Sequence, residues 1–183
     1  MGVIGHNRGP EMNGLSWRTQ CWRAARARLL PTLPIEVVRL RVRRAAQLGL
    51  DYKTYAGMRA STGHDLVAFL FSSNALRVLR AGQVLPGDRA QKLAALQGTG
   101  LIGLALPPLQ AADLARAAPA LTASHAAPLH LASFAEARVR LRMALGTIPS
   151  DTVLLIGDHG LEAEWCAAGR LAGYLPAERY FGT

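Results

Sequence analysis

The chain has 183 residues, a length that suits one domain with its own hydrophobic core. Half of the residues are hydrophobic and 18% are charged, a composition that excludes an intrinsically disordered protein. Two cysteines exclude a fold built on disulfides, and no apolar run approaches the roughly 20 residues that span a bilayer. Residues 1–12 contain no hydrophobic stretch that could direct secretion, so we expect a cytoplasmic protein.

Positive charge is concentrated in the first third of the chain. The net charge is +9; residues 1–64 hold 11 Lys and Arg against three acids, whereas residues 65–183 hold 10 against nine. Nineteen of the 21 basic residues are arginine, whose planar guanidinium group suits phosphate better than the lysine amine does. This asymmetry predicts a polyanionic partner, with nucleic acid favoured over an anionic membrane surface.

The chain is predicted to begin with a flexible arm and a basic helix. Residues 1–14 are rich in glycine and poor in apolar side chains, which is typical of a flexible arm. A domain is expected over residues 15–183, in which Ser16 can cap a helix over residues 17–30. Tryptophans alternate with arginines in this helix; they can stack on bases or pack into a core. The expected phosphate contacts are Arg18, Arg23 and Arg26.

Two further helices complete the Arg-rich segment, residues 15–63. The first, residues 35–48, has an apolar stripe of Ile35, Val38, Val42 and Ala45, and the second covers residues 52–61. With Gly49 at the turn and Tyr55 and Met58 expected to face inward, they resemble a helix-turn-helix in spacing. Many structural hairpins share this spacing, so packing on the body of the protein is the alternative. The candidate nucleic-acid contacts are Arg41, Arg44, Lys53, Thr54 and Arg59.

Residues 64–183 are predicted to form a parallel-sheet body. Four short apolar runs, at residues 66–71, 101–106, 129–132 and 152–156, alternate with helical segments at 88–96, 109–117, 134–145 and 161–172. Runs that are apolar throughout are typical of strands buried on both faces, and their spacing fits strand–helix–strand units. The expected fold is therefore α/β, a small doubly wound, mostly parallel sheet of about four strands with an N-terminal basic helical segment.

Polar residues follow the expected strands, where doubly wound folds bind ligands. Ser72, Ser73 and Asn74 follow the first run, and Asp158 and His159 follow the last. They can hold a phosphate, or Ser73 can act as a nucleophile beside an Asp158–His159 pair. The alternative is that they close strands and cap helices, with Asp158 capping the last helix.

The sequence offers no cofactor or metal signature. The glycines of the Gly98-x-Gly-x-x-Gly run enter a strand instead of following one, and the histidines and cysteines lack metal-ligand spacing, so no cofactor and no metal site are predicted. The sequence favours nucleic-acid binding by the basic helices. A small enzyme or phosphorylated-ligand binder is the second hypothesis. The third is an interaction module for an acidic protein partner, or for the chain's own acidic helix around Glu162 and Glu164.

Overall fold

The computed structural model describes residues 33–129 and 131–182. The chain divides into two compact units, residues 1–39 and 40–183, and only residues 33–39 of the first are described. The predicted arm, the helix predicted at residues 17–30 and its three arginines lie outside the described residues. Among the helices that are described, none combines the length and the hydrophobicity that a bilayer crossing requires.

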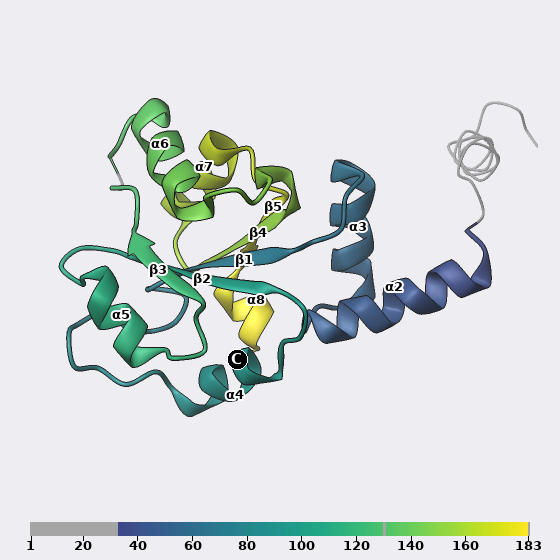
Figure 1. The fold of residues 1–183 in the computed structure, drawn as a ribbon, viewed down its shortest axis with the longest axis horizontal. Coiled ribbons are helices and arrows are strands. Elements are labelled where there is room, and N and C mark those ends of the chain that lie inside the picture. The colour runs from purple at the N-terminus through teal and green to yellow at the C-terminus, as the bar shows by residue number, and fades with distance from the viewer. Residues whose placement is uncertain (1–32, 130, 183) are drawn as a thin grey trace, which may run out of the picture. The chain divides into compact units, whose positions relative to one another are not determined.

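A five-stranded parallel sheet forms the centre of the second unit (Figure 1). Its strands in chain order are β1 (Ala68–Ser72), β2 (Gly100–Ala105), β3 (Ala123–Ala126), β4 (Val153–Gly157) and β5 (Gly173–Pro176). They lie in the order β3-β2-β1-β4-β5, and every neighbouring pair is parallel. The predicted α/β fold with a small parallel sheet is thus confirmed, with one strand more than the four expected.

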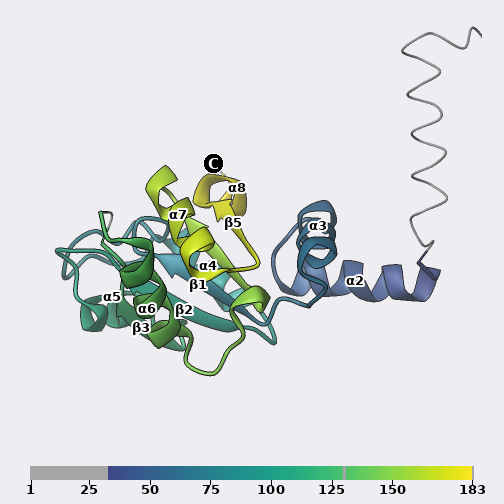
Figure 2. The ribbon, with the colours of Figure 1, turned by 90° about the horizontal axis from the view of Figure 1, so that it is seen from above.

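Helices cover both faces of this sheet (Figures 1 and 2). The described helices are α2 (Ile35–Gln47), α3 (Tyr52–Thr62), α4 (Gly87–Ala95), α5 (Ala111–Ala117), α6 (Phe134–Leu145), α7 (Gly160–Gly169) and α8 (Ala177–Phe181), with a 3-10 turn at Ser150–Thr152. Side chains alternate along β1. Leu70 belongs to the core on the face covered by α6 and α7, together with Trp165 of α7. Phe69 and Phe71 point to the opposite face and pack against Tyr180 of α8, with ring centroids 5.7 and 5.9 Å from that of Tyr180.

The third strand was predicted at the wrong place. The structure has β3 at Ala123–Ala126, whereas in the predicted run Leu129 is 52% exposed and Leu131 is 95% exposed. As an edge strand that pairs only with β2, β3 is partly exposed, so it lacks the apolar run that marks a central strand. The fifth strand, β5, was not predicted, because its four residues include a glycine and a proline.

The predicted inner face of α2 is also wrong. Of the expected apolar stripe only Ala45 is fully buried, and Val42 is 47% exposed. Leu48 continues the buried side, and Arg44 lies beside it with its side chain 20% exposed. Burial of an arginine requires hydrogen-bond acceptors nearby, and the fold supplies them.

Candidate functional site

The turn between α2 and α3 is built by local signals. Gly49 has a φ of +62°, in the left-handed region that favours glycine. Asp51 then caps α3 by accepting a hydrogen bond from the Thr54 amide at 2.9 Å. The Thr54 hydroxyl also donates to this carboxylate, and these bonds hold the pKa of Asp51 below its ordinary value. Tyr55 is buried, as predicted, and Met58 is partly buried.

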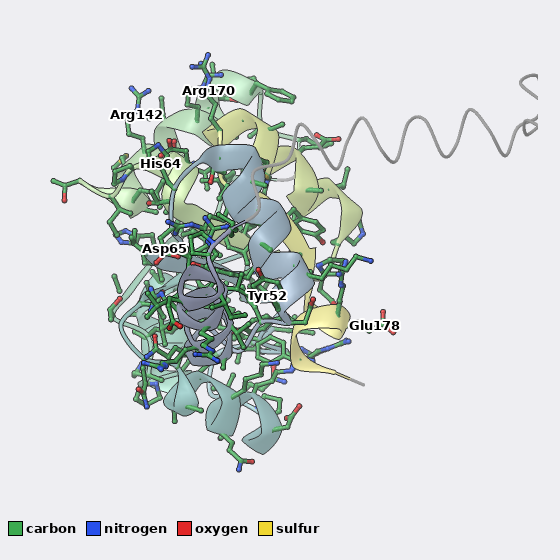
Figure 3. The ribbon with its side chains drawn as sticks, turned by 90° about the vertical axis from the view of Figure 1, so that its right-hand side faces the viewer. Tyr52, His64, Asp65, Arg142, Arg170 and Glu178 are labelled. Carbon is green, nitrogen blue, oxygen red and sulfur yellow. The ribbon has the colours of Figure 1, made fainter. Side chains whose placement is uncertain are left out.

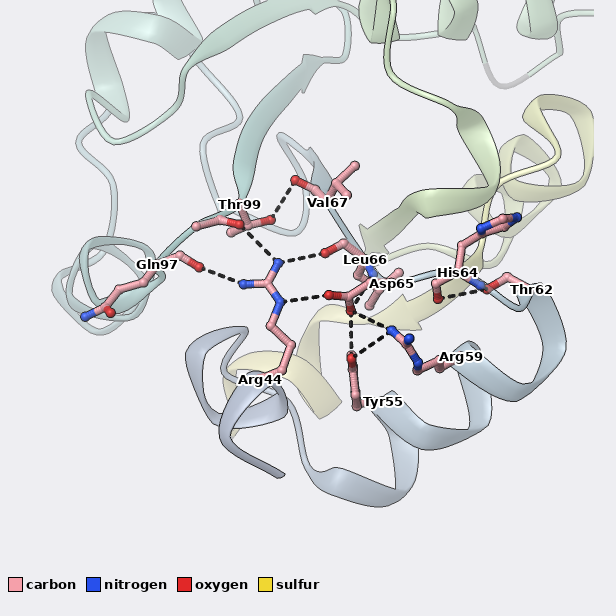
Figure 4. Close-up of polar contacts among 11 residues, drawn as sticks. Arg44, Tyr55, Arg59, Thr62, His64, Asp65, Leu66, Val67, Gln97 and Thr99 are labelled. Carbon is pink, nitrogen blue, oxygen red and sulfur yellow. Dashed lines mark hydrogen bonds and ion pairs between the residues drawn. The ribbon is translucent and has the colours of Figure 1, made fainter. Parts of the chain in front are cut away.

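Arg44 joins the hairpin to the start of the sheet (Figure 4). Its Nε donates to the Asp65 carboxylate at 3.2 Å, just before β1. The terminal nitrogens donate to three backbone carbonyls, those of Leu66 at 2.9 Å, Gly98 at 3.0 Å and Gln97 at 3.2 Å. This residue therefore connects α2 to the segments that lead into β1 and β2, which is a structural role and not an open phosphate contact.

Through its other carboxylate oxygen, Oδ1, Asp65 contacts side chains of α3, the second helix of the hairpin (Figure 4). The Tyr55 hydroxyl donates to Asp65 Oδ1 at 2.7 Å, and Arg59 lies 3.6 Å from the same oxygen. Burial, and then the adjacent carboxylate, raise the pKa of Tyr55. Thr54 accepts a hydrogen bond from Arg179 of α8 at 2.8 Å. Three of the five described nucleic-acid candidates thus have internal partners.

Three basic side chains of the hairpin have no partner in the part of the chain that the structure describes. Arg41, Arg43 and Lys53 make no side-chain hydrogen bond or ion pair with any residue in the described part of the chain. Arg43 and Lys53 are exposed, and Arg41 is half-buried. Arg43 was not singled out in the sequence, because the adjacent Arg44 fitted the predicted outer face equally well.

Arg44→Ala is expected to lower the free energy of unfolding by about 2 kcal/mol, because it removes four hydrogen bonds between elements far apart in sequence. Arg43→Ala, which removes the same charge from an exposed position, should change stability by less than about 0.5 kcal/mol. Urea unfolding followed by circular dichroism measures both. Equal stability of the two variants would contradict a structural role for Arg44.

The second predicted site lies beside β1, where the order in which the chain adds strands to the sheet reverses. From β1 the chain crosses to β2 and β3 on one side, whereas β4 and β5 lie on the other side of β1. The ends of β1 and β4 are therefore neighbours, as their paired residues Phe71 and Ile156 show. Such a switch point is where open parallel sheets bind ligands. The structure brings the predicted residues Ser72 and Asn74 toward Asp158, through a residue that the prediction did not include.

That residue is Glu162, whose side chain is completely buried. Its carboxylate accepts hydrogen bonds from the Ser72 hydroxyl at 2.8 Å, the Asn74 side-chain amide at 2.7 Å and the Asp158 backbone amide at 2.8 Å. We call Glu162 and these three donors the strand-end clamp. The sequence offered Glu162 only as part of an acidic helix on which the Arg-rich segment could dock, whereas the structure buries its side chain. Its position in the first turn of α7 was the available signal, since acids at that position bond backbone amides.

The other strand-end residues also have local partners. Ser73 is buried, and its hydroxyl accepts from the Leu106 amide at 3.2 Å. His159, not Asp158 as predicted, caps α7, with its Nδ1 accepting from the Leu161 amide at 3.3 Å. Asp158 lies 3.7 Å from Arg77. A catalytic or ligand-binding role for Ser72, Ser73, Asn74, Asp158 and His159 stays a prediction.

Tyr174 of β5 borders the same cluster. Its hydroxyl donates to the His159 carbonyl at 3.2 Å. Burial raises its pKa, and the negative charges of Glu162 and Asp158 raise it further. Within the described residues, no group of three or more His, Cys, Asp or Glu side chains is arranged to hold a metal ion.

Comparison of the chain with protein-family models, with curated proteins and with solved structures finds no significant match. Its function must therefore be inferred from the charge and contacts of its own residues. The hairpin offers basic side chains without partners among residues 33–129 and 131–182, whereas the strand ends offer polar groups that mostly bond one another.

Proposed function

We propose that the protein binds nucleic acid through basic residues of the α2–α3 hairpin that have no partner among the described residues. The residues that would contact phosphates are Arg41, Arg43 and Lys53. Nucleic-acid binding needs cations that are free to replace the counterions of phosphate groups. These three side chains meet that requirement, because no described residue neutralises them.

The observation that carries the proposal is that the basic side chains of the hairpin fall into two groups, those that bind within the fold and those with no partner among the described residues. Arg44 and Arg59 share Asp65 and attach the hairpin to the sheet. Arg43 and Lys53 have no such use, and they belong to a segment, residues 1–64, that carries a net charge of +8. A large excess of like charge destabilises a folded chain by self-repulsion, so a partner that neutralises it is the better explanation.

A double variant tests this role. In Arg43→Gln with Lys53→Gln, affinity for a labelled oligonucleotide should fall at least tenfold at moderate salt, as measured by fluorescence anisotropy. The slope of log affinity against log salt should become shallower by about two, since two phosphate contacts are lost. Duplex DNA, single-stranded DNA and RNA are compared, and the preferred strand type then identifies the partner.

The matched control removes the same charge elsewhere. Arg80 and Arg140 are exposed and lie outside the hairpin, so Arg80→Gln with Arg140→Gln should lower affinity less than twofold. An equal loss in both double variants would mean that net charge alone drives binding, without a site on the hairpin. No binding by the full chain even at low salt would refute the proposal.

A further inference from the structure

A second basic feature lies away from the hairpin, at the C-terminal ends of α6 and α7. A hollow of about 440 Å³ opens there. Its walls include Arg138, Arg142, Arg170, Leu145, Ile148 and Ser150. We call it the arginine pocket. Its volume falls in the range of sites for small organic ligands, roughly 300–1,000 Å³.

The charge of the arginine pocket is not neutralised from within. None of its lining residues is acidic. Arg142 and Arg170 make no side-chain hydrogen bond or ion pair with a described residue, whereas Arg138 donates through Nε to the Ala168 carbonyl at 3.0 Å. Figure 3 shows the Arg142 and Arg170 side chains near each other and pointing outward. Two free guanidinium groups beside one hollow are suited to the oxygens of a phosphate group.

The backbone at Arg170 is a second, independent observation. Arg170 ends α7 with φ 53° and ψ 46°, in the left-handed region. Helices commonly end with a residue in this conformation, and it is usually glycine or asparagine, because a Cβ atom is unfavourable there. An exposed arginine at such a position lowers stability without gaining packing. Sparsely populated backbone conformations of this kind cluster at ligand sites.

The competing explanation for these arginines is that their positive charges compensate the dipoles of α6 and α7. Cations near the C-terminal end of a helix are favourable, and Arg142 and Arg170 both lie at such ends. This effect does not need two cations from different helices to line one hollow. It also does not need the apolar walls that Leu145 and Ile148 provide.

We propose that the arginine pocket binds a phosphorylated small molecule of nucleotide size. Arg142 and Arg170 would hold its phosphate groups, while Leu145 and Ile148 would contact its less polar part. Ser150 adds a hydroxyl group that can donate to the ligand or accept from it. This ligand is additional to the nucleic acid proposed for the hairpin, and the two sites share no residue.

Isothermal titration with ADP, inorganic phosphate and adenosine tests the proposal. The full chain should bind ADP, and the affinity for adenosine should be at least tenfold lower. Arg170→Gly should lower ADP affinity at least tenfold without lowering the melting temperature, because glycine suits the left-handed backbone. Arg142→Gln should have a similar effect on affinity.

Arg140→Gln is the matched control. It removes the same charge from the same helix but from another surface, and it should bind ADP as the unchanged chain does. Equal losses in all three variants, or no ADP binding at millimolar concentration, would overturn the proposal. Binding of phosphate but not of ADP would overturn the nucleotide-sized ligand. The hairpin variant Arg43→Gln with Lys53→Gln should keep ADP affinity, so this proposal and the nucleic-acid proposal can fail separately.

Discussion

Replacement of Glu162 by alanine is expected to lower the free energy of unfolding by about 3–5 kcal/mol. The reason is burial: the carboxylate has no solvent exposure and accepts three hydrogen bonds. Without it, the Ser72 hydroxyl, the Asn74 amide and the Asp158 backbone amide lose their acceptor. At the end of the sheet, water can replace it only in part.

Thermal and urea unfolding measure this effect. A chain of this size should lose about 10 °C in melting temperature. Glu164→Ala is the control, because Glu164 is exposed on the same helix and its loss should change stability by less than about 0.5 kcal/mol. Glu162→Gln should be intermediate, since the amide keeps one acceptor oxygen and turns the other into a donor. A Glu162→Ala variant as stable as the unchanged chain would show that the strand-end clamp contributes nothing.

Gly157→Ala is expected to cost about 2–3 kcal/mol, although it adds a single methyl group. Gly157 is the last residue of β4, and a Cβ atom there would collide with the Glu162 carboxylate and lie 2.7 Å from the Tyr174 ring. The Glu162 carboxylate would have to move away from its three hydrogen-bond donors to make room. Gly160→Ala, three residues later, meets no atom within 4 Å and should be close to neutral in the same unfolding experiment.

A double-mutant cycle tests whether the two effects have one origin. In a Glu162→Ala background the carboxylate is gone, so Gly157→Ala should cost less than it does alone. The contacts with the Tyr174 ring and with the Cβ atom of residue 162 would remain. Coupling of at least about 1 kcal/mol is expected for residues in contact. Strictly additive losses would contradict a shared origin and would assign the cost of Gly157→Ala to contacts other than the Glu162 carboxylate.

The central strands were predictable from sequence because they obey a simple rule. Strands buried on both faces are nearly continuous apolar runs, and β1, β2 and β4 follow this rule apart from Ser72 at the end of β1. The edge strands escape this rule. In β3 the side chains are only partly buried, and in β5 a glycine and a proline interrupt the apolar pattern. These edge strands form because they pair with a central strand, β2 or β4. The central strand lies elsewhere in the sequence, so a short window around the edge strand does not reveal it.

The polar sites were less predictable for a related reason. Arg44 and Arg43 are adjacent residues of one type, and only tertiary acceptors 21 to 54 residues away distinguish the half-buried one from the exposed one. Glu162 has donors 88 and 90 residues earlier in the chain. By contrast, the cap of α6 was readable directly: Ser133 and Glu136 bond each other's backbone amides three residues apart.

The position of β1 at the middle of the sheet governs when the protein can finish folding during synthesis. Phe69 pairs with Leu101 on one side and with Leu154 on the other. A growing chain on the ribosome can add β2 early, but the other edge of β1 has no partner until β4 has left the exit tunnel. Until then a strand of wholly buried side chains presents open backbone groups, the kind of edge that recruits other chains. The interval between β1 and β4 is therefore the period in which a chaperone would be most useful to this protein.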